Sequence, residues 1–209
     1  MPLIRAVEAG DLDALYEVCL RTGDAGADGT SLFKDPRLLG EVYVGPYLSV
    51  RGGLGLTAVD DDGPAGYALA AVDTRRFEAE CEAEWWPALR ARYPDPGPGP
   101  ATPDEEVIAV IHRPHRALDA VVARFPAHLH LDLLPRLQGR GVGRIMMGRM
   151  LGELVARGVE GVHLGADARN QRAIGFYTHL GFITLEADEY GVVMGIRLDK
   201  EPWQQVTPP

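Results

Sequence analysis

The stretch Leu131–Arg144, LDLLPRLQGRGVGR, contains the strongest structural signal in the chain. Its leucines predict a short buried strand that ends at Pro135, and the glycines after it predict a turn into a helix reaching about Ala156. A glycine-rich turn lets several backbone N–H groups point at one anion, because no Cβ stands in the way, and the positive end of the helix dipole adds to the attraction. The stretch therefore predicts a phosphate or pyrophosphate site, with Arg140 and Arg144 as additional positive charges.

Two common phosphate-binding loops do not fit this turn. The dinucleotide fingerprint requires G-x-G-x-x-G after a first strand, whereas Gly139–Gly143 has the spacing G-x-G-x-G and lies late in the chain. The Walker loop requires Lys and then Ser or Thr after its last glycine, where this chain has Arg144 and Ile145. What remains is Q-x-x-G-x-G, from Gln138 to Gly143, at the end of a strand. A glycine-rich helix start that binds no ligand is the alternative.

A second pattern follows after one further predicted strand. The segment Asn170–Phe182, NQRAIGFYTHLGF, has the form N-x-x-A-x-x-x-Y-x-x-x-G-F and predicts a helix. Asn170 is expected either to cap it or to hydrogen-bond a bound ligand, and Ala173 and Tyr177 are four residues apart and so share one helix face. Gly181 predicts the end of the helix. An ordinary amphipathic helix with its apolar residues in the core is the alternative interpretation.

The two patterns together resemble the acyl-CoA pyrophosphate loop and the following helix of the GCN5-related N-acetyltransferase (GNAT) superfamily. The chain is also similar, over almost its whole length, to the acetyltransferase-like domain family found at the C-terminus of eukaryotic O-GlcNAcase and in free-standing bacterial relatives. The segments that show this are 23–30, 44–48, 66–69, 86–87, 93–94 and 125–126. The intact Q-x-x-G-x-G hexad implies that this chain binds an acyl-CoA.

The resemblance implies an α/β fold with a GNAT-like, mixed, mostly antiparallel central sheet flanked by helices, in one domain of residues 1–209. The strands expected from the apolar pattern are 3–6, 54–59, 65–72, 131–134, 161–165, 182–186 and 192–198. Residues 73–126 then form a helical insertion between the third and fourth strands. A long segment with its own helices usually shapes a site, so we expect it to help form the acceptor pocket; an interface or a decorative insertion is the alternative.

The implied reaction moves an acetyl group directly from acetyl-CoA, as co-substrate, to an amine. Backbone groups of the fourth strand are expected to pair with the pantetheine amides, as an added strand would. The expected cofactor contacts are Leu131, Asp132, Leu133, Gln138, Gly139, Arg140, Gly141, Val142, Gly143, Arg144, Asn170, Ala173, Phe176 and Tyr177.

Two proton transfers are needed. Tyr177 is the expected general acid for the leaving thiolate, and a tyrosine that only packs against the cofactor sulfur is the alternative. An alkyl ammonium has a pKa of about 10.4, so a base must take its proton at neutral pH. His128, His130 and Asp132 alternate along the fourth strand and therefore face one side, with Asp132 the first expected base and His130 the second. The alternatives are a semi-buried, hydrogen-bonded histidine pair and a metal triad, although the resemblance implies no metal.

The acceptor is open between a small-molecule amine and a peptide lysine. Asp24 and Asp28 are expected to hold a cationic substrate, and Trp85 and Trp86 are expected to form an aromatic pocket for it. Turn capping by the aspartates and core packing by the tryptophans are the alternatives. A non-catalytic acyl-CoA-binding or protein-recognition domain with the same fold is the second functional interpretation.

Composition limits the partners and the compartment. The 209 residues are 46% hydrophobic and 24% charged, with a net charge of −9 and no long Lys/Arg run, so no nucleic-acid partner is expected. An acidic surface suits a cationic amine. The apolar runs are too short to cross a membrane and no signal-peptide pattern is present, which predicts the cytoplasm and no membrane partner. Cys19 and Cys81 are expected to be buried free thiols, and the resemblance adds a homodimer as an expectation.

Overall fold

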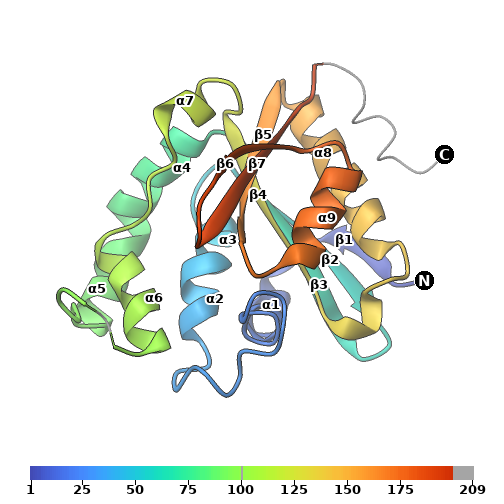
Figure 1. Ribbon diagram of the computed structural model, residues 1–209. Coiled ribbons are helices and arrows are strands. Elements are labelled where there is room, and N and C mark those ends of the chain that lie inside the picture. The colour runs from blue at the N-terminus through green and yellow to red at the C-terminus, as the bar shows by residue number, and fades with distance from the viewer. Residues whose placement is uncertain (100, 200–209) are drawn as a thin grey trace.

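A seven-stranded sheet forms the centre of the molecule, with strand order β1-β2-β3-β4-β5-β7-β6 (Figure 1). The computed structural model describes residues 1–99 and 101–199; the rest of the predicted domain, residues 100 and 200–209, lies outside the described residues. The strands are β1 (Leu3–Ala6), β2 (Gly53–Asp60), β3 (Gly63–Ala71), β4 (Ala127–Leu133), β5 (Gly161–Asp167), β6 (Ile183–Ala187) and β7 (Gly191–Arg197). Neighbours pair antiparallel except β4 and β5, which are parallel. The predicted mixed, mostly antiparallel α/β sheet is therefore confirmed.

The fourth strand is longer than its apolar pattern predicted. β4 begins at Ala127, whereas the leucine run placed its start at Leu131. Its register with β3 runs from Ala71 opposite His128 to Gly66 opposite Leu133. The first half of β4 alternates apolar residues with histidines, and backbone pairing to β3 holds these residues in the sheet even though they do not form a continuous apolar run.

Helices cover both faces of the sheet and fill the insertion (Figure 1). They are α1 (Leu12–Leu20), α2 (Leu38–Tyr43), α3 (Gly45–Ser49), α4 (Thr74–Glu80), α5 (Trp86–Arg92), α6 (Pro103–His112), α7 (Asp119–Val122), α8 (Val142–Ala156) and α9 (Gln171–His179), with short turns η1 (Ala9–Asp11), η2 (Cys81–Trp85, a π-helix) and η3 (Pro135–Leu137). Figure 1 shows α4, α5, α6 and α7 grouped on the side of the sheet away from α8. The helical insertion between β3 and β4 is thus present as predicted.

Buried polar contacts fix the insertion beside α2. Glu41 of α2 is buried and accepts hydrogen bonds from Arg92 at 2.5 Å and from the Tyr93 hydroxyl at 3.0 Å. The backbone N–H groups of Lys34 and Asp35 donate to the Asp104 carboxylate on α6. A carboxylate can stay buried only when it is paired and hydrogen-bonded in this way. These contacts hold α6 against the segment that follows α1.

The sheet opens between β4 and β5. These strands share two register pairs, Ala127 with Val162 and His128 with His163, and no further pair within the described residues. The Leu134 N–H donates to the Ala65 carbonyl at 2.9 Å, so by strand alternation the backbone groups of Leu131 and Leu133 point away from β3 and toward the opening. The opening therefore leaves a length of backbone edge exposed between α8 and α9.

Two further expectations can be compared with the structure. Cys19 and Cys81 are both buried free thiols, as predicted. In the part of the chain that the structure describes, no helix combines the length and the apolar character needed to span a membrane.

Candidate active site

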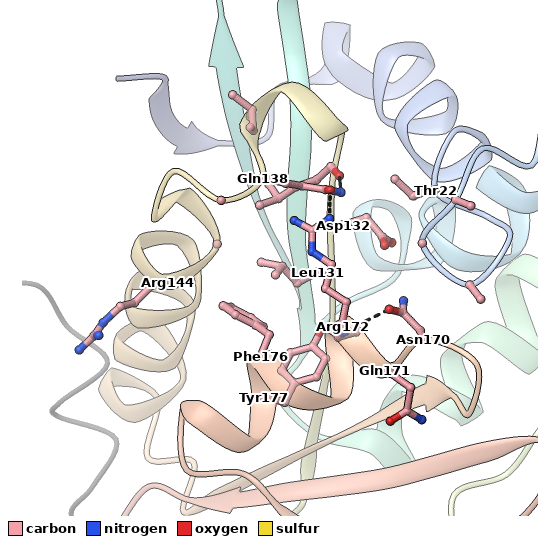
Figure 2. Close-up of a pocket in the computed structure, with 18 of the residues that line it drawn as sticks. Thr22, Leu131, Asp132, Gln138, Arg144, Asn170, Gln171, Arg172, Phe176 and Tyr177 are labelled. Carbon is pink, nitrogen blue, oxygen red and sulfur yellow. Dashed lines mark hydrogen bonds between the residues drawn. The ribbon is translucent and has the colours of Figure 1, made fainter.

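Two cavities lie along the part of β4 that is not paired with β5. The first, here named the loop cavity, has a volume of about 620 Å³ and lies against the glycine-rich turn at Gln138–Arg144, the end of β4 and one face of α9 (Figure 2). The second, named the insertion cavity, has a volume of about 600 Å³ and lies between β4, β5, α2 and α6.

The two cavities meet. Nine residues line both of them: Thr22, Ala25, Gly26, Leu131, Asp132, Arg169, Asn170, Ala173 and Tyr177. A molecule in one cavity can therefore touch a molecule in the other beside Asp132 and Tyr177. This arrangement suits a direct transfer between two bound molecules.

The glycine-rich turn has the geometry of an anion cradle. Gly139 and Gly141 have left-handed φ angles of +71° and +78°, which favour glycine, and a Cβ at either would meet nothing within 4 Å. Helical bonding in α8 begins with the Ile145 N–H donating to the Gly141 carbonyl at 3.2 Å. The amides of Val142 and Gly143 precede that bond, so they need acceptors from outside the helix. The turn therefore has free amides of the kind that a phosphate requires, and the phosphate site itself stays a prediction.

Side chains around the turn hold it against β4. The Gln138 Nε2 donates to the Leu133 carbonyl at 2.6 Å, and Arg172 donates to the Gln138 Oε1 (Figure 2). Arg172 and Gln171 also line the loop cavity, and neither was predicted from the sequence. Arg172 could have been predicted, because it is a cation in the first turn of a helix that follows a candidate phosphate loop.

The cations predicted next to the turn are placed differently. Arg144 lines the loop cavity, but Figure 2 shows its side chain extending outward from α8, away from Leu131 and Tyr177. Arg140 does not line the cavity and donates to the Arg136 carbonyl at 3.2 Å. Val142 is buried in the core and does not line the loop cavity.

The predicted helix face on α9 is formed. Asn170 caps α9, with its side-chain oxygen accepting from the Ala173 N–H at 3.0 Å. Ala173 and Tyr177 line both cavities, and Phe176 lines the loop cavity. A Cβ on Gly143 would lie 3.3 Å from Phe176, so the glycine lets α8 and α9 approach each other. Burial first, and the Asp132 charge second, raise the pKa of Tyr177, so its phenol keeps its proton at neutral pH and can donate it.

Asp132 lies at the junction of the two cavities with one carboxylate oxygen anchored. Its Oδ2 accepts from the Tyr67 hydroxyl at 2.6 Å. Burial raises the pKa of Asp132, and the hydrogen bond from Tyr67 first and the nearby Thr22 hydroxyl second oppose that rise. The backbone of Asp132 pairs with Tyr67 of β3, so the backbone edge in the opening comes from Leu131 and Leu133.

The two histidines of β4 are packed among aromatic rings. His130 lines the insertion cavity, contacts the rings of Tyr43 and Tyr47, and has its pKa lowered by burial to about 4. His128 lines neither cavity, and its Nδ1 shares a hydrogen bond with the Thr74 hydroxyl at 2.9 Å. Across residues 1–99 and 101–199, no group of three His, Cys, Asp or Glu side chains is arranged to hold a metal ion.

The residues predicted to hold the acceptor are only partly brought together. Asp24 lines the insertion cavity and pairs with Arg169 at 3.0 Å. Asp28 is exposed outside both cavities, and its carboxylate accepts from the Thr30 N–H at 2.9 Å, which is the turn-capping alternative. Trp85 and Trp86 also lie outside both cavities. Trp85 donates from its indole to the Glu41 carbonyl at 2.9 Å, and Trp86 is part of the core. Burial of a large apolar ring lowers the free energy of the folded chain, which favours packing over exposure in a cavity.

Other residues line the insertion cavity in their place. The insertion contributes Pro103, Glu106 and Val107 from α6, and the main fold contributes Leu39, Tyr43, Gly165 and Asp167. No local sequence pattern identified these residues individually. The sequence predicted only that the insertion containing α6 helps to shape a pocket.

Comparisons with known proteins agree with this geometry. The family model of the acetyltransferase (GNAT) family matches residues 45–182. Protein O-GlcNAcase of Rattus norvegicus is 28% identical over 180 residues, which are 85% of this chain and 20% of that protein. Mycothiol acetyltransferase of Beutenbergia cavernae is 42% identical over 63 residues, which are 30% of this chain and 21% of that protein. The matches thus span about a fifth of the length of these curated relatives.

Solved structures share the fold. The structure of SsHAT superposes with a TM-score of 0.87 and 38% identity, covering 94% of this chain and 98% of that one. The structure of yncA from Salmonella typhimurium with its cofactor acetyl-CoA superposes with a TM-score of 0.56 and 17% identity, covering 97% and 96% of the two chains. At 17% identity this second likeness concerns the fold alone.

Proposed function

This chain belongs to the GNAT family of acetyltransferases, and we propose that it moves an acetyl group from acetyl-CoA to an amine by direct transfer. The observation that supports this is the meeting of two cavities beside Asp132 and Tyr177. One cavity has a phosphate cradle at its far end, and the other has none but is lined by carboxylates. Direct transfer requires two such adjoining compartments, one for each substrate.

Acetyl-CoA fits the loop cavity by the chemistry of its lining. Gly139 and Gly141 place no Cβ at two positions of the turn, and the first amides of α8 would donate to the pyrophosphate. Arg172 adds a positive charge at the same wall. The backbone edge at Leu131 and Leu133 can pair with the pantetheine amides, since its groups point into the opening. When bound, the cofactor supplies the acetyl thioester, and the residues at the junction accept and donate the protons.

Asp132 takes the proton from the attacking amine in this proposal, and Tyr177 donates one to the departing thiolate. A buried carboxylate with a raised pKa is a better proton acceptor than an exposed one, and a tyrosine with a raised pKa stays protonated as a donor. His130 is the second choice as base. Its pKa of about 4 leaves it neutral at pH 7, so it can accept a proton, but it lines only the insertion cavity and not the junction.

The insertion cavity is proposed to hold the acceptor. Its carboxylates include Asp24, Glu106, Asp132 and Asp167, against one lining arginine, Arg169. Arg169 pairs with both Asp24 and Asp167. A surplus of negative charge favours a cationic amine over a neutral or anionic acceptor. A small amine and a peptide lysine both satisfy this charge, and the choice between them stays open.

A combined binding and acetyl-transfer assay tests the proposal. Acetyl-CoA should bind with saturation, and thiol release from it should depend on added amine, with acetylated amine recovered in equal amount. Spermidine, N-α-acetyl-lysine and an amino sugar form a first panel of acceptors. Saturable binding of acetyl-CoA without transfer to any amine would instead favour a non-catalytic acyl-CoA-binding or protein-recognition domain. Absence of binding would refute both interpretations.

A further inference from the structure

We propose that Tyr67 is a positioning residue, which holds the Asp132 carboxylate in its charged form at the junction of the loop cavity and the insertion cavity. This inference rests on the proposed role of Asp132 as the base. Tyr67 lines neither cavity and touches no substrate in the proposal, so its effect on the reaction passes through Asp132.

The strand register fixes the geometry of this pair. Tyr67 on β3 lies directly opposite Asp132 on β4, and directly opposed side chains lie on the same face of the sheet. The phenol hydroxyl donates to the Oδ2 of Asp132 at 2.6 Å, a distance typical of a charge-assisted hydrogen bond. Tyr67 itself is only 1% exposed, so packing leaves its ring little freedom. Tyr67 therefore fixes one oxygen of the Asp132 carboxylate, while Asp132 itself lines both cavities.

The electrostatic surroundings make this donor important. From α1, the Cys19 thiol interacts with the Tyr67 hydroxyl, and burial raises the pKa of this thiol to about 12, so it is neutral. The Thr22 hydroxyl faces Asp132 from the loop after α1, and Tyr177 faces it from α9. All of these groups are neutral at pH 7. The carboxylate therefore depends on hydrogen bonds to offset its desolvation.

The charged groups nearby do not replace that donor. Arg172 is engaged with Gln138, and Arg169 with Asp24 and Asp167. On β4 itself, His130 is kept neutral by burial, with its pKa lowered to about 4. Removal of the Tyr67 hydroxyl would leave a desolvated carboxylate with one donor fewer, and its pKa would rise.

The test compares Tyr67→Phe with the unchanged protein in two measurements. The first is the pH dependence of kcat/KM with acetyl-CoA and N-α-acetyl-lysine. A higher pKa of the base moves the acid limb to higher pH, and we expect a displacement of about one pH unit, the size of one charged hydrogen bond. The KM for acetyl-CoA should stay unchanged. The second is direct titration of the Asp132 carboxyl carbon by NMR, which requires no turnover.

Two controls separate positioning from general damage to the core. Tyr16→Phe removes the hydroxyl of another buried tyrosine and should leave the acid limb in place. In an Asp132→Asn background, Tyr67→Phe should produce no further displacement, since the titrating group is gone. Measured unfolding free energies show whether either phenylalanine variant is less stable.

The outcomes are distinct. A rise in the NMR pKa together with a displaced acid limb supports the proposal. An unchanged NMR pKa overturns it, and so does a raised NMR pKa with an unmoved limb, because Tyr67 would then act on a carboxyl that is not the base. Full activity of Asp132→Asn contradicts the base assigned under the proposed function, and the NMR titration still measures the effect of Tyr67 on Asp132.

Discussion

A glutamate in place of Gly141 should strongly weaken acetyl-CoA binding, and the opposite end of the same helix provides the control. Gly141 precedes α8 with a φ of +78°, and Gly158 follows α8 with a φ of +77°. A Cβ at either glycine would meet nothing within 4 Å. The two positions thus share their backbone strain and their open surroundings, and differ in that Gly141 lines the loop cavity.

The expected magnitudes follow from that pairing. A left-handed φ costs a non-glycine residue about 1–2 kcal/mol, so Gly141→Ala and Gly158→Ala should lose similar unfolding free energy. At Gly141 a carboxylate placed roughly 4–6 Å from a bound phosphate would add repulsion of about 3–4 kcal/mol at an effective dielectric constant near 20. Gly141→Glu should therefore weaken acetyl-CoA binding by about two to three orders of magnitude.

Isothermal titration calorimetry with acetyl-CoA measures these affinities directly, and urea unfolding gives the stability of each variant. Gly158→Ala and Gly158→Glu should bind acetyl-CoA like the unchanged protein. Survival of the original affinity in Gly141→Glu would show that the pyrophosphate lies elsewhere. Equal loss in the two glutamate variants would attribute the effect to α8 itself rather than to the cradle.

Three further changes test the junction and the second cavity. Tyr177→Phe should lower kcat about a hundredfold with nearly intact acetyl-CoA affinity, because a general acid contributes at least that much; unchanged kcat removes Tyr177 from the mechanism. Gly165→Leu places a side chain in open space on β5, and crowding of about 1–3 kcal/mol should raise the KM for the amine tenfold or more. An equal loss of acetyl-CoA affinity would contradict the division of the cavities. Because the pKa of His130 falls from 6.5 to about 4 on folding, the unfolded chain binds more protons between these values, and stability should drop as pH falls through that window. Urea unfolding at pH 7 and pH 4.5 should show a smaller drop in His130→Phe, and an equal drop would mean that His130 is not the cause.

The insertion lines the insertion cavity through α6 and not through its predicted aromatic residues. Three residues of α6 reach the insertion cavity, while Trp85 and Trp86 pack toward α2 and the core. The sequence marked residues 73–126 as an additional segment, but the side of each helix that faces the cavity depends on the Glu41 contacts that fix the insertion. Substitutions in α6, rather than of the tryptophans, are therefore the ones expected to alter acceptor choice.

The local features of the cofactor side were readable from the sequence. The glycine turn, the end of α8 at Ala156, the Asn170 cap and the shared face of Ala173 and Tyr177 all appeared as predicted. Each of them depends on residues within one or two turns of chain, where backbone φ angles, capping bonds and helical periodicity are set by the residue types present. Such interactions leave a fixed spacing in the sequence.

The tertiary structure alone decided what surrounds the reacting groups. Tyr67 and Asp132 are 65 positions apart in sequence, and only the register of β3 against β4 brings the phenol to the carboxylate. The opening between β4 and β5 depends on where their pairing stops, and the insertion cavity combines residues from α2, α6 and β5. Contacts of this kind arise from the packing of distant segments, which no short pattern encodes. The glycine turn could therefore be predicted from the sequence, whereas the lining of the insertion cavity depends on the folded arrangement.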